Sequence, residues 1–306
     1  MILVTGATGF LGTELCLKLD NLGLEYKKTS LSLGLDLKNE KESIEYFKTV
    51  SPDYVLNCSA FLGGVQFEYE HAADMFRNNM LMQLTLLEAC KQSNVKRLIN
   101  PIGNCSYPGE ASMYVESEFW NGPLHESVLA YGLAKKSFCG AAWAYGKQYG
   151  LDTVNLVFSN MYGPNDHFDE LRSHAVGALI MKFVKAKQNN SPTVTVWGSG
   201  KPIREWLYVD DACEAMIKAM DIEPYNDIIN IGVGKGYSIK DTARMISDIV
   251  GYQGGIVYDT SKLDGAPCKQ VDGTLCKKLL NWSPKTSFED GLRKTIDWYI
   301  NSINSK

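Results

Sequence analysis

Three evenly spaced glycines come directly after the first predicted strand of this 306-residue chain. Residues 2–4 form a short apolar run, and the turn GATGFLG at residues 6–12 leads into a helical pattern with a leucine at every fourth position. In this order of strand, turn and helix, the glycines let backbone N–H groups at the positive end of the helix approach a pyrophosphate. We therefore expect a bound dinucleotide here. The predicted contacts are Gly6, Thr8, Gly9, Phe10, Leu11 and Gly12.

Strand and helix patterns alternate through the first half of the chain. Strands are predicted at residues 2–4, 25–29, 54–57, 97–101 and 153–157, each followed by a helical pattern or a turn. Such alternation predicts parallel strands joined by right-handed crossovers, with helices on both faces of the sheet. The expected fold class is α/β, a Rossmann-type doubly wound parallel sheet.

The pattern changes after Pro164, where helical stretches are separated by longer polar loops. This predicts a smaller C-terminal α/β lobe that binds the substrate. We assign residues 1–165, with a return of the chain around 206–232, to the dinucleotide-binding domain, and 166–205 and 233–306 to the smaller lobe. Doubly wound sheets bind ligands at the carboxyl ends of their strands, so we expect the site between the two lobes.

Charge and hydropathy exclude several classes of protein. A net charge of -4 argues against sequence-independent binding of nucleic acid, which needs a basic surface. No apolar stretch approaches the roughly 18–20 residues of a membrane span, and the N-terminus has no signal-peptide pattern, which predicts a cytoplasmic protein. The eight cysteines form no CxxC pair and no Cys or His pair has ligand spacing, so we expect free thiols and no metal site.

The end of the second predicted strand indicates which dinucleotide is bound. NAD-selective sites usually place an acidic side chain there to hold the ribose 2′-hydroxyl. This strand instead ends in Lys27, Lys28, Thr29 and Ser30, whose ammonium and hydroxyl groups suit a 2′-phosphate. We therefore favour NADP(H), with NAD(H) as the alternative. The further predicted cofactor contacts are Asp36 and Leu37, at the adenine edge, and Ala60.

Tyr131 and Lys135 lie one helical turn apart on the same face of a predicted helix. The nearby ammonium favours the phenolate, so we expect Lys135 to lower the pKa of Tyr131. Such a tyrosine exchanges a proton with a carbonyl oxygen near neutral pH. We expect both residues to be catalytic and to contact the cofactor, with Lys135 holding the ribose.

Several motifs resemble one known family along nearly the whole chain. These motifs are GATGFLG at 6–12, YGLAK at 131–135, NMYGPND at 160–166 and REWLYVDDA at 204–212. They are similar to the extended short-chain dehydrogenase/reductases, the NAD-dependent epimerase/dehydratase family. Within that family the chain is most similar to the GDP-L-fucose synthases, through residues 61–65, 105–108, 173–174 and 196–200 as well.

The resemblance implies an enzyme acting on a nucleotide-linked, GDP-type 4-keto sugar. By motif position, Cys105 and His174 would be the acid–base pair that epimerises the carbons beside the ketone, and Tyr131 with Lys135 would serve reduction of C4 by NADPH. A homodimer through residues 75–92 and 131–150 is also implied. The implied substrate contacts are Asn160, Leu179, Lys182, Trp197 and Arg204. Lys182 stands where arginine is more typical, which removes a bidentate phosphate contact.

One position departs from the family pattern. Gly103 occupies the place of a Ser or Thr that helps to hold the ketone oxygen. Asn104, Ser106 or water would then have to supply this donor, or the glycine makes room for a different sugar. The alternatives are therefore an enzyme that only reduces or only epimerises, and a non-catalytic dinucleotide-binding protein.

Overall fold

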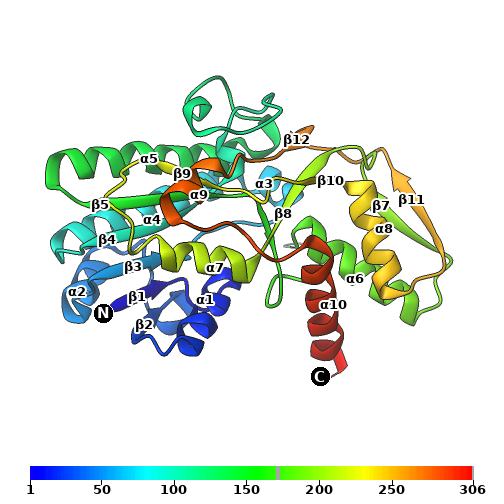
Figure 1. Cartoon of the computed structure of the whole chain (residues 1–306), viewed down its shortest axis with the longest axis horizontal. Helices are drawn as coiled ribbons and strands as arrows, with labels where there is room; N and C mark the ends of the chain where they lie inside the picture. The colour runs from blue at the N-terminus through cyan, green and yellow to red at the C-terminus, as the bar shows by residue number, and fades with distance from the viewer. Residues whose placement is uncertain (170–172, 305–306) are drawn as a thin grey trace.

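The computed structural model describes residues 1–169 and 173–304, and its centre is a six-stranded parallel sheet (Figure 1). The strands lie in the order β2-β1-β3-β4-β5-β9, so the chain proceeds in both directions from β1. This arrangement confirms the predicted doubly wound α/β fold. The strands are β1 (Ile2–Thr5), β2 (Tyr26–Thr29), β3 (Tyr54–Asn57), β4 (Arg97–Gly103), β5 (Asp152–Phe158) and β9 (Ile228–Ile231).

Helices cover both faces of this sheet, as Figure 1 shows. The apolar sides of α1 and α7 belong to one core cluster, and those of α2, α4 and α5 belong to a second. The helices are α1 (Phe10–Asn21), α2 (Glu40–Val50), α4 (Ala72–Gln92), α5 (Leu129–Tyr149) and α7 (Val209–Lys218). β2 is an edge strand of this sheet. Its Lys27 and Lys28 are therefore exposed, whereas its neighbour β1 is buried along its whole length.

A row of buried polar side chains crosses the centre of the sheet. Thr5 Oγ1 donates to Asn57 Oδ1 at 2.7 Å, and Asn57 Nδ2 donates to Asn100 Oδ1 at 2.7 Å. Asn100 Nδ2 in turn reaches Asn155 Oδ1 at 3.5 Å. Since a buried amide without a partner costs free energy, this row favours one alignment of β1, β3, β4 and β5.

The C-terminal part of the chain builds two smaller sheets at the other end of the molecule (Figure 1). Their helices and strands surround one apolar core that contains Phe183, Trp206 and Phe288. The limits of the two lobes stay a prediction. The strands are β6 (Asn160–Tyr162), β7 (Thr193–Trp197), β8 (Ile203–Tyr208), β10 (Gly236–Ser238), β11 (Gly255–Asp259) and β12 (Cys268–Lys269), and the helices are α6 (Ala175–Gln188), α8 (Ile239–Val250) and α10 (Phe288–Asn304). The remaining helix, α9 (Thr274–Leu280), packs instead against β9 of the large sheet.

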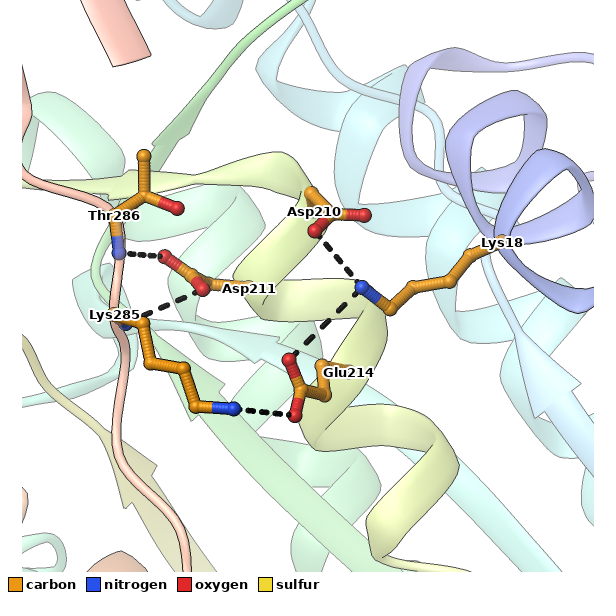
Figure 2. Close-up of polar contacts among 6 residues, drawn as sticks. All are labelled: Lys18, Asp210, Asp211, Glu214, Lys285 and Thr286. Carbon is orange, nitrogen blue, oxygen red and sulfur yellow. Dashed lines mark hydrogen bonds and ion pairs between the residues drawn. The ribbon is translucent and has the colours of Figure 1, made fainter. Parts of the chain in front are cut away.

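Polar contacts around α7 join distant parts of the chain, as Figure 2 shows. The buried carboxylate of Asp211 accepts hydrogen bonds from the backbone N–H groups of Lys285, at 3.3 Å, and Thr286, at 2.9 Å. On the other side of α7, Lys18 of α1 forms an ion pair with Asp210 at 2.8 Å. The segment that leads into α10 is therefore held against a helix that covers the large sheet.

Replacing the buried carboxylate should destabilise the chain measurably. In Asp211→Ala the two backbone donors lose their acceptor, and we expect the free energy of unfolding to fall by about 2 kcal/mol. Glu214→Ala is the matched control, since it removes only ion pairs of partly exposed side chains, worth roughly 0–1 kcal/mol. Urea unfolding followed by circular dichroism measures both changes, and equal losses would contradict the role of Asp211.

Candidate active site

The three glycines of the turn after β1 serve different purposes. Gly6 has a φ of +63°, and a Cβ there would lie 2.5 Å from the carbonyl carbon of Cys58. A Cβ on Gly12 would lie 2.2 Å from the Gly6 oxygen, whereas one on Gly9 would meet only that oxygen, at 3.4 Å. Packing within the protein therefore requires glycine at 6 and 12. The bare surface at Gly9, the N-cap of α1, is left to a ligand that lies over the turn.

A cluster of three hydroxyl groups lies beyond the carboxyl end of β2. Thr8 Oγ1 is 2.9 Å from Ser30 Oγ and 2.8 Å from Ser32 Oγ, and the two serine oxygens are 3.0 Å apart. Thr8 was a predicted cofactor contact, whereas no role was predicted for Ser32. Since these hydroxyls can all donate hydrogen bonds, the cluster suits an anionic group on the ribose.

The other predicted cofactor residues lie in segments that follow β2, β3 and the glycine turn. Asp36 accepts a hydrogen bond from the backbone N–H of Lys38 at 2.9 Å, and Ala60 is half-buried after β3. The side chains of Leu11 and Leu37 belong to the apolar core. Any contact of these two leucines with a cofactor must therefore be made by their backbone.

Tyr131 and Cys105 meet beside Gly103. A Cβ on Gly103 would lie 3.0 Å from Cys105 Sγ and 3.2 Å from Cε1 of Tyr131. The helix that carries Tyr131 comes this close because Gly132 has no side chain: a Cβ there would lie 2.6 Å from the Cys105 carbonyl oxygen. The hydroxyl of Ser106 donates to the Gly132 carbonyl at 3.1 Å and closes the contact. The structure thus brings together two of the four predicted catalytic residues.

Burial controls the ionisation of Tyr131 and Lys135. Lys135 Nζ donates to the Pro101 carbonyl at 3.3 Å and lies 5.8 Å from the centroid of the Tyr131 ring. Burial lowers the pKa of Lys135 to about 8. Burial also raises the pKa of Tyr131 well above its ordinary value, and the charges of Cys105 and Glu68 add to the rise. This direction contradicts the predicted lowering of the Tyr131 pKa by Lys135, because burial of the Tyr131 ring raises the pKa.

The thiol of Cys105 lies in the 3-10 helix η2 (Asn104–Ser106) and is 8% exposed. Burial raises the pKa of Cys105 to about 11, although the nearby charge of Lys269 opposes this. The thiol is therefore neutral near pH 7. It becomes a base only when a neighbouring group accepts its proton.

His174 is the N-cap of α6 and is paired with a buried carboxylate. Its Nδ1 lies 3.2 Å from Oδ1 of Asp166, whose side chain is 1% exposed. Burial by itself would lower the pKa of His174, but the charge and hydrogen bond of Asp166 outweigh it and raise the pKa. The pair favours an imidazolium, which is a proton donor.

Positive and aromatic side chains of the smaller lobe gather near the predicted substrate contacts. Lys182 Nζ lies 4.8 Å from the ring centroid of Trp197, which is half exposed, and donates to the Thr195 carbonyl at 3.0 Å. Arg204 of β8 is in register with Lys269 of β12. Burial lowers the pKa of Lys269, and the Arg204 charge adds to this effect, so an anion between the two cations would be stabilised.

Two predicted substrate residues are placed differently from these. Leu179 belongs to the apolar core of the smaller lobe, with only 5% of its surface exposed. Asn160 begins β6, and its Nδ2 is buried with no hydrogen-bond partner among the described residues. The three charged residues that sequence reasoning missed are Glu68, Asp166 and Lys269. Only Asp166 was within a quoted motif, NMYGPND, while nothing in the spacing of the other two marked them.

Comparison with known proteins identifies the family of this chain. Residues 2–232 match the model of a family described as NAD dependent epimerase/dehydratase. The chain belongs to this family. A family member from Arabidopsis thaliana, putative GDP-L-fucose synthase 2, is 34% identical over 306 residues, which cover 100% of this chain and 93% of the relative. The GDP-L-fucose synthase of Escherichia coli K12 is 32% identical, covering 98% of this chain and 96% of its own.

Solved structures show the same similarity. A GDP-6-OMe-4-keto-L-xylo-heptose reductase from C. jejuni superposes with a TM-score of 0.91 at 27% identity, covering 98% of this chain and 97% of that one. A GDP-L-fucose synthetase from Naegleria fowleri bound to NADP gives a TM-score of 0.90 at 28% identity, covering 99% and 93%.

Within residues 1–169 and 173–304, no helix has the length and apolar character needed to cross a membrane. In the same ranges no three His, Cys, Asp or Glu side chains gather closely enough to hold a metal ion.

The pairing of His174 with Asp166 can be tested directly. Because the carboxylate raises the pKa of His174, Asp166→Asn should lower that pKa, and the imidazolium should be lost at lower pH than in the wild-type chain. An NMR titration of the His174 ring signals measures the change. Asp264→Asn, in the same lobe, is the control and should leave the His174 titration unmoved. An unchanged pKa in Asp166→Asn would contradict the pairing.

Proposed function

We propose that this chain uses NADP(H) to epimerise and then reduce a GDP-linked 4-keto sugar. The observation that carries the proposal is the meeting of the Cys105 thiol and the Tyr131 ring beside Gly103, at the end of β4. A thiol suits proton removal beside a ketone, and a phenol suits proton delivery to the ketone oxygen. Relatives named GDP-L-fucose synthases support the choice of a GDP-linked sugar.

The cofactor assignment rests on the glycine turn and the hydroxyl cluster. Gly9 and the N-terminus of α1 would hold the pyrophosphate, and the hydroxyls of Thr8, Ser30 and Ser32 would hold the 2′-phosphate of NADP(H). The NADP-bound synthetase from N. fowleri supports this choice. NADPH supplies the hydride when bound.

In the reduction, Tyr131 delivers the proton. Because burial raises its pKa, the phenol is protonated at neutral pH and can donate to the C4 oxygen as negative charge develops there. Lys135 donates a hydrogen bond to the Pro101 carbonyl and would also bind the ribose. The ammonium is thus placed to stabilise the phenolate once the proton has left.

In the epimerisation, Cys105 and His174 act on opposite faces of the sugar. The thiolate of Cys105 would remove a proton from a carbon beside the ketone, and the imidazolium of His174 would return one to the other face. Asp166 keeps His174 charged for this step. The diphosphate of the substrate would lie between Arg204 and Lys269, and Trp197 with Lys182 would pack against the nucleoside.

Asn104 and Ser106 are the two neighbouring side chains that could replace the donor missing at Gly103. The Ser106 hydroxyl already donates to Gly132, but Nδ2 of Asn104 is buried with no hydrogen-bond partner among the described residues. We assign the lost role to Asn104. The second candidate function is a reductase that does not epimerise, which the heptose reductase neighbour favours.

Two readouts separate the steps. The chain is incubated in deuterated water with GDP-4-keto-6-deoxymannose, first without and then with NADPH. Deuterium at C3 or C5 without NADPH reports epimerisation, and NADPH consumption reports reduction. We expect both. Tyr131→Phe should slow NADPH consumption by about 100-fold or more while deuterium still enters, and Cys105→Ser should stop deuterium uptake. NADPH consumption with no deuterium uptake by the wild-type chain would instead identify a reductase alone.

We also propose a homodimer formed through α4 and α5. These helices lie side by side on one face of the sheet (Figure 1) and expose large apolar side chains to solvent. Large apolar side chains exposed on neighbouring helices are typical of interfaces. The exposed residues are Phe76, Leu81, Leu84, Leu129, Leu133, Trp143 and Tyr149.

Charges on this surface should separate the subunits. The double variant Leu84→Glu/Trp143→Glu should halve the mass measured by light scattering, because two buried carboxylates per subunit would have no partner. Leu17→Glu, an equally exposed leucine on α1, is the control and should leave the mass unchanged. A wild-type chain that is monomeric at micromolar concentration would contradict the dimer.

A further inference from the structure

The connection between β11 and β12, residues 260–267, has no role in the chemistry described above. At its start, Asp259 of β11 is in register with Trp197 of β7. At its end, Lys269 of β12 is in register with Arg204 of β8. The connection therefore runs from the indole proposed to pack against the nucleoside to the guanidinium proposed to bind the diphosphate.

The side chain of Asp264 ties the middle of this connection to the turn after β7. The backbone N–H of Ser199 donates to Oδ1 of Asp264 at 2.6 Å, and the Ser199 hydroxyl donates to Oδ2 at 2.7 Å. Gly198 has a φ of +82°, and a Cβ there would lie 2.3 Å from Oδ1 of Asp264. Glycine at 198 thus makes room for the carboxylate directly after Trp197.

The backbone of the connection also contacts Arg204. Nη2 of Arg204 donates to the Asp264 carbonyl at 3.4 Å, and Nη1 donates to the Ile203 carbonyl at 2.8 Å. A Cβ on Gly265, which has a φ of +71°, would lie 3.5 Å from the same Nη2. These carbonyls orient the guanidinium without neutralising its charge.

Lys262 brings a further cation to the same place. Its Nζ lies 5.2 Å from the ring centroid of Trp197, whose side chain is half exposed. Lys262 is two residues from Asp264, so their Cα atoms are at most about 7 Å apart. The ammonium is therefore carried by the segment that contacts Arg204. An anion beside Trp197 would meet positive charge from both Lys262 and Arg204.

The acidic side chains nearest to Lys262 in the sequence are both bonded to serines. Asp264 accepts from Ser199, as described above. Asp259 accepts hydrogen bonds from Ser261, from the backbone N–H at 3.1 Å and from the hydroxyl at 2.6 Å. These donors stabilise both carboxylates in place, so each has a structural partner of its own.

We propose that Lys262 binds the diphosphate of the substrate and that Asp264 is a positioning residue that holds Lys262 and Arg204 for this contact. The inference rests on the proposed GDP-linked substrate. Residues 260–267 then form a wall of the nucleotide site, in addition to Trp197 and Lys182. None of these groups touches the reacting carbons, so their effect is on binding of the nucleotide and not on the chemical steps.

The contact of Lys262 is tested with GDP as the ligand. Lys262→Ala should bind GDP about 10-fold more weakly than the wild-type chain, because one charge-assisted contact is lost. Lys262→Arg keeps the cation and should retain most of the affinity. Lys185→Ala, which removes an exposed lysine of α6 in the same lobe, is the matched control and should bind GDP like the wild-type chain. Isothermal titration calorimetry measures each affinity.

A double-mutant cycle tests whether Asp264 acts through Lys262. Asp264→Ala should also weaken GDP binding by about 10-fold, and Lys262→Ala/Asp264→Ala should bind GDP no more weakly than Asp264→Ala alone. Asp248→Ala, at an exposed position of α8, is the control and should bind GDP normally. In the NADPH-consumption assay KM for the GDP-linked sugar should rise with kcat unchanged, because the lost interaction is one of binding alone. NADPH binding and thermal unfolding should also be unchanged.

Three results would overturn the inference while the proposed function stands. Wild-type GDP affinity in Lys262→Ala would exclude the diphosphate contact. An additive loss of about 100-fold in the double variant would exclude the positioning role. Lower thermal stability of Asp264→Ala together with its loss of affinity would identify a structural role instead. A wild-type chain that binds no GDP would overturn the GDP-linked substrate of the proposed function, and the role of Lys262 with it.

Discussion

The contact between α5 and the segment after β4 is the constraint on which the site depends. Gly132 lets the backbone of the helix lie against the Cys105 carbonyl, and the Ser106 hydroxyl holds the two segments together. This contact sets the distance between the thiol and the Tyr131 ring, and it leaves room at position 103 for only the smallest residue without a shift of Tyr131 or Cys105. Any larger side chain at Gly132 would separate the two reactive groups.

Loss of hydration gives the site its chemical character. Burial brings the pKa of Lys135 to about 8 and that of Glu68 to about 7, so both groups can change charge near neutrality. The same burial keeps the phenol of Tyr131 and the thiol of Cys105 protonated near neutral pH. Ionisable groups so displaced from their ordinary pKa values cluster at functional sites, because catalysis needs protons that move easily at working pH.

Much of the fold was predictable, because strands and helices leave local patterns in the sequence. The glycine turn, five of the six strands of the large sheet and the helix with Tyr131 and Lys135 were all identified from such patterns. The predicted ionisation of Tyr131 was wrong because it considered the charge of Lys135 and left out the burial of the ring. Glu68 and Lys269 were missed because the segments that carry them come to the site from distant parts of the chain.

The sequence by itself determined the doubly wound architecture and the turn at Gly6–Gly12, since strand alternation and glycine spacing are properties of neighbouring residues. It also determined which residue types are available, including the missing hydroxyl at Gly103. Only the tertiary structure decided which of them meet. It placed Cys105 beside Tyr131, Asp166 beside His174 and Glu68 among their charges. The physical reason is that desolvation and electrostatic interaction depend on distances in space, which residue spacing along the chain does not encode.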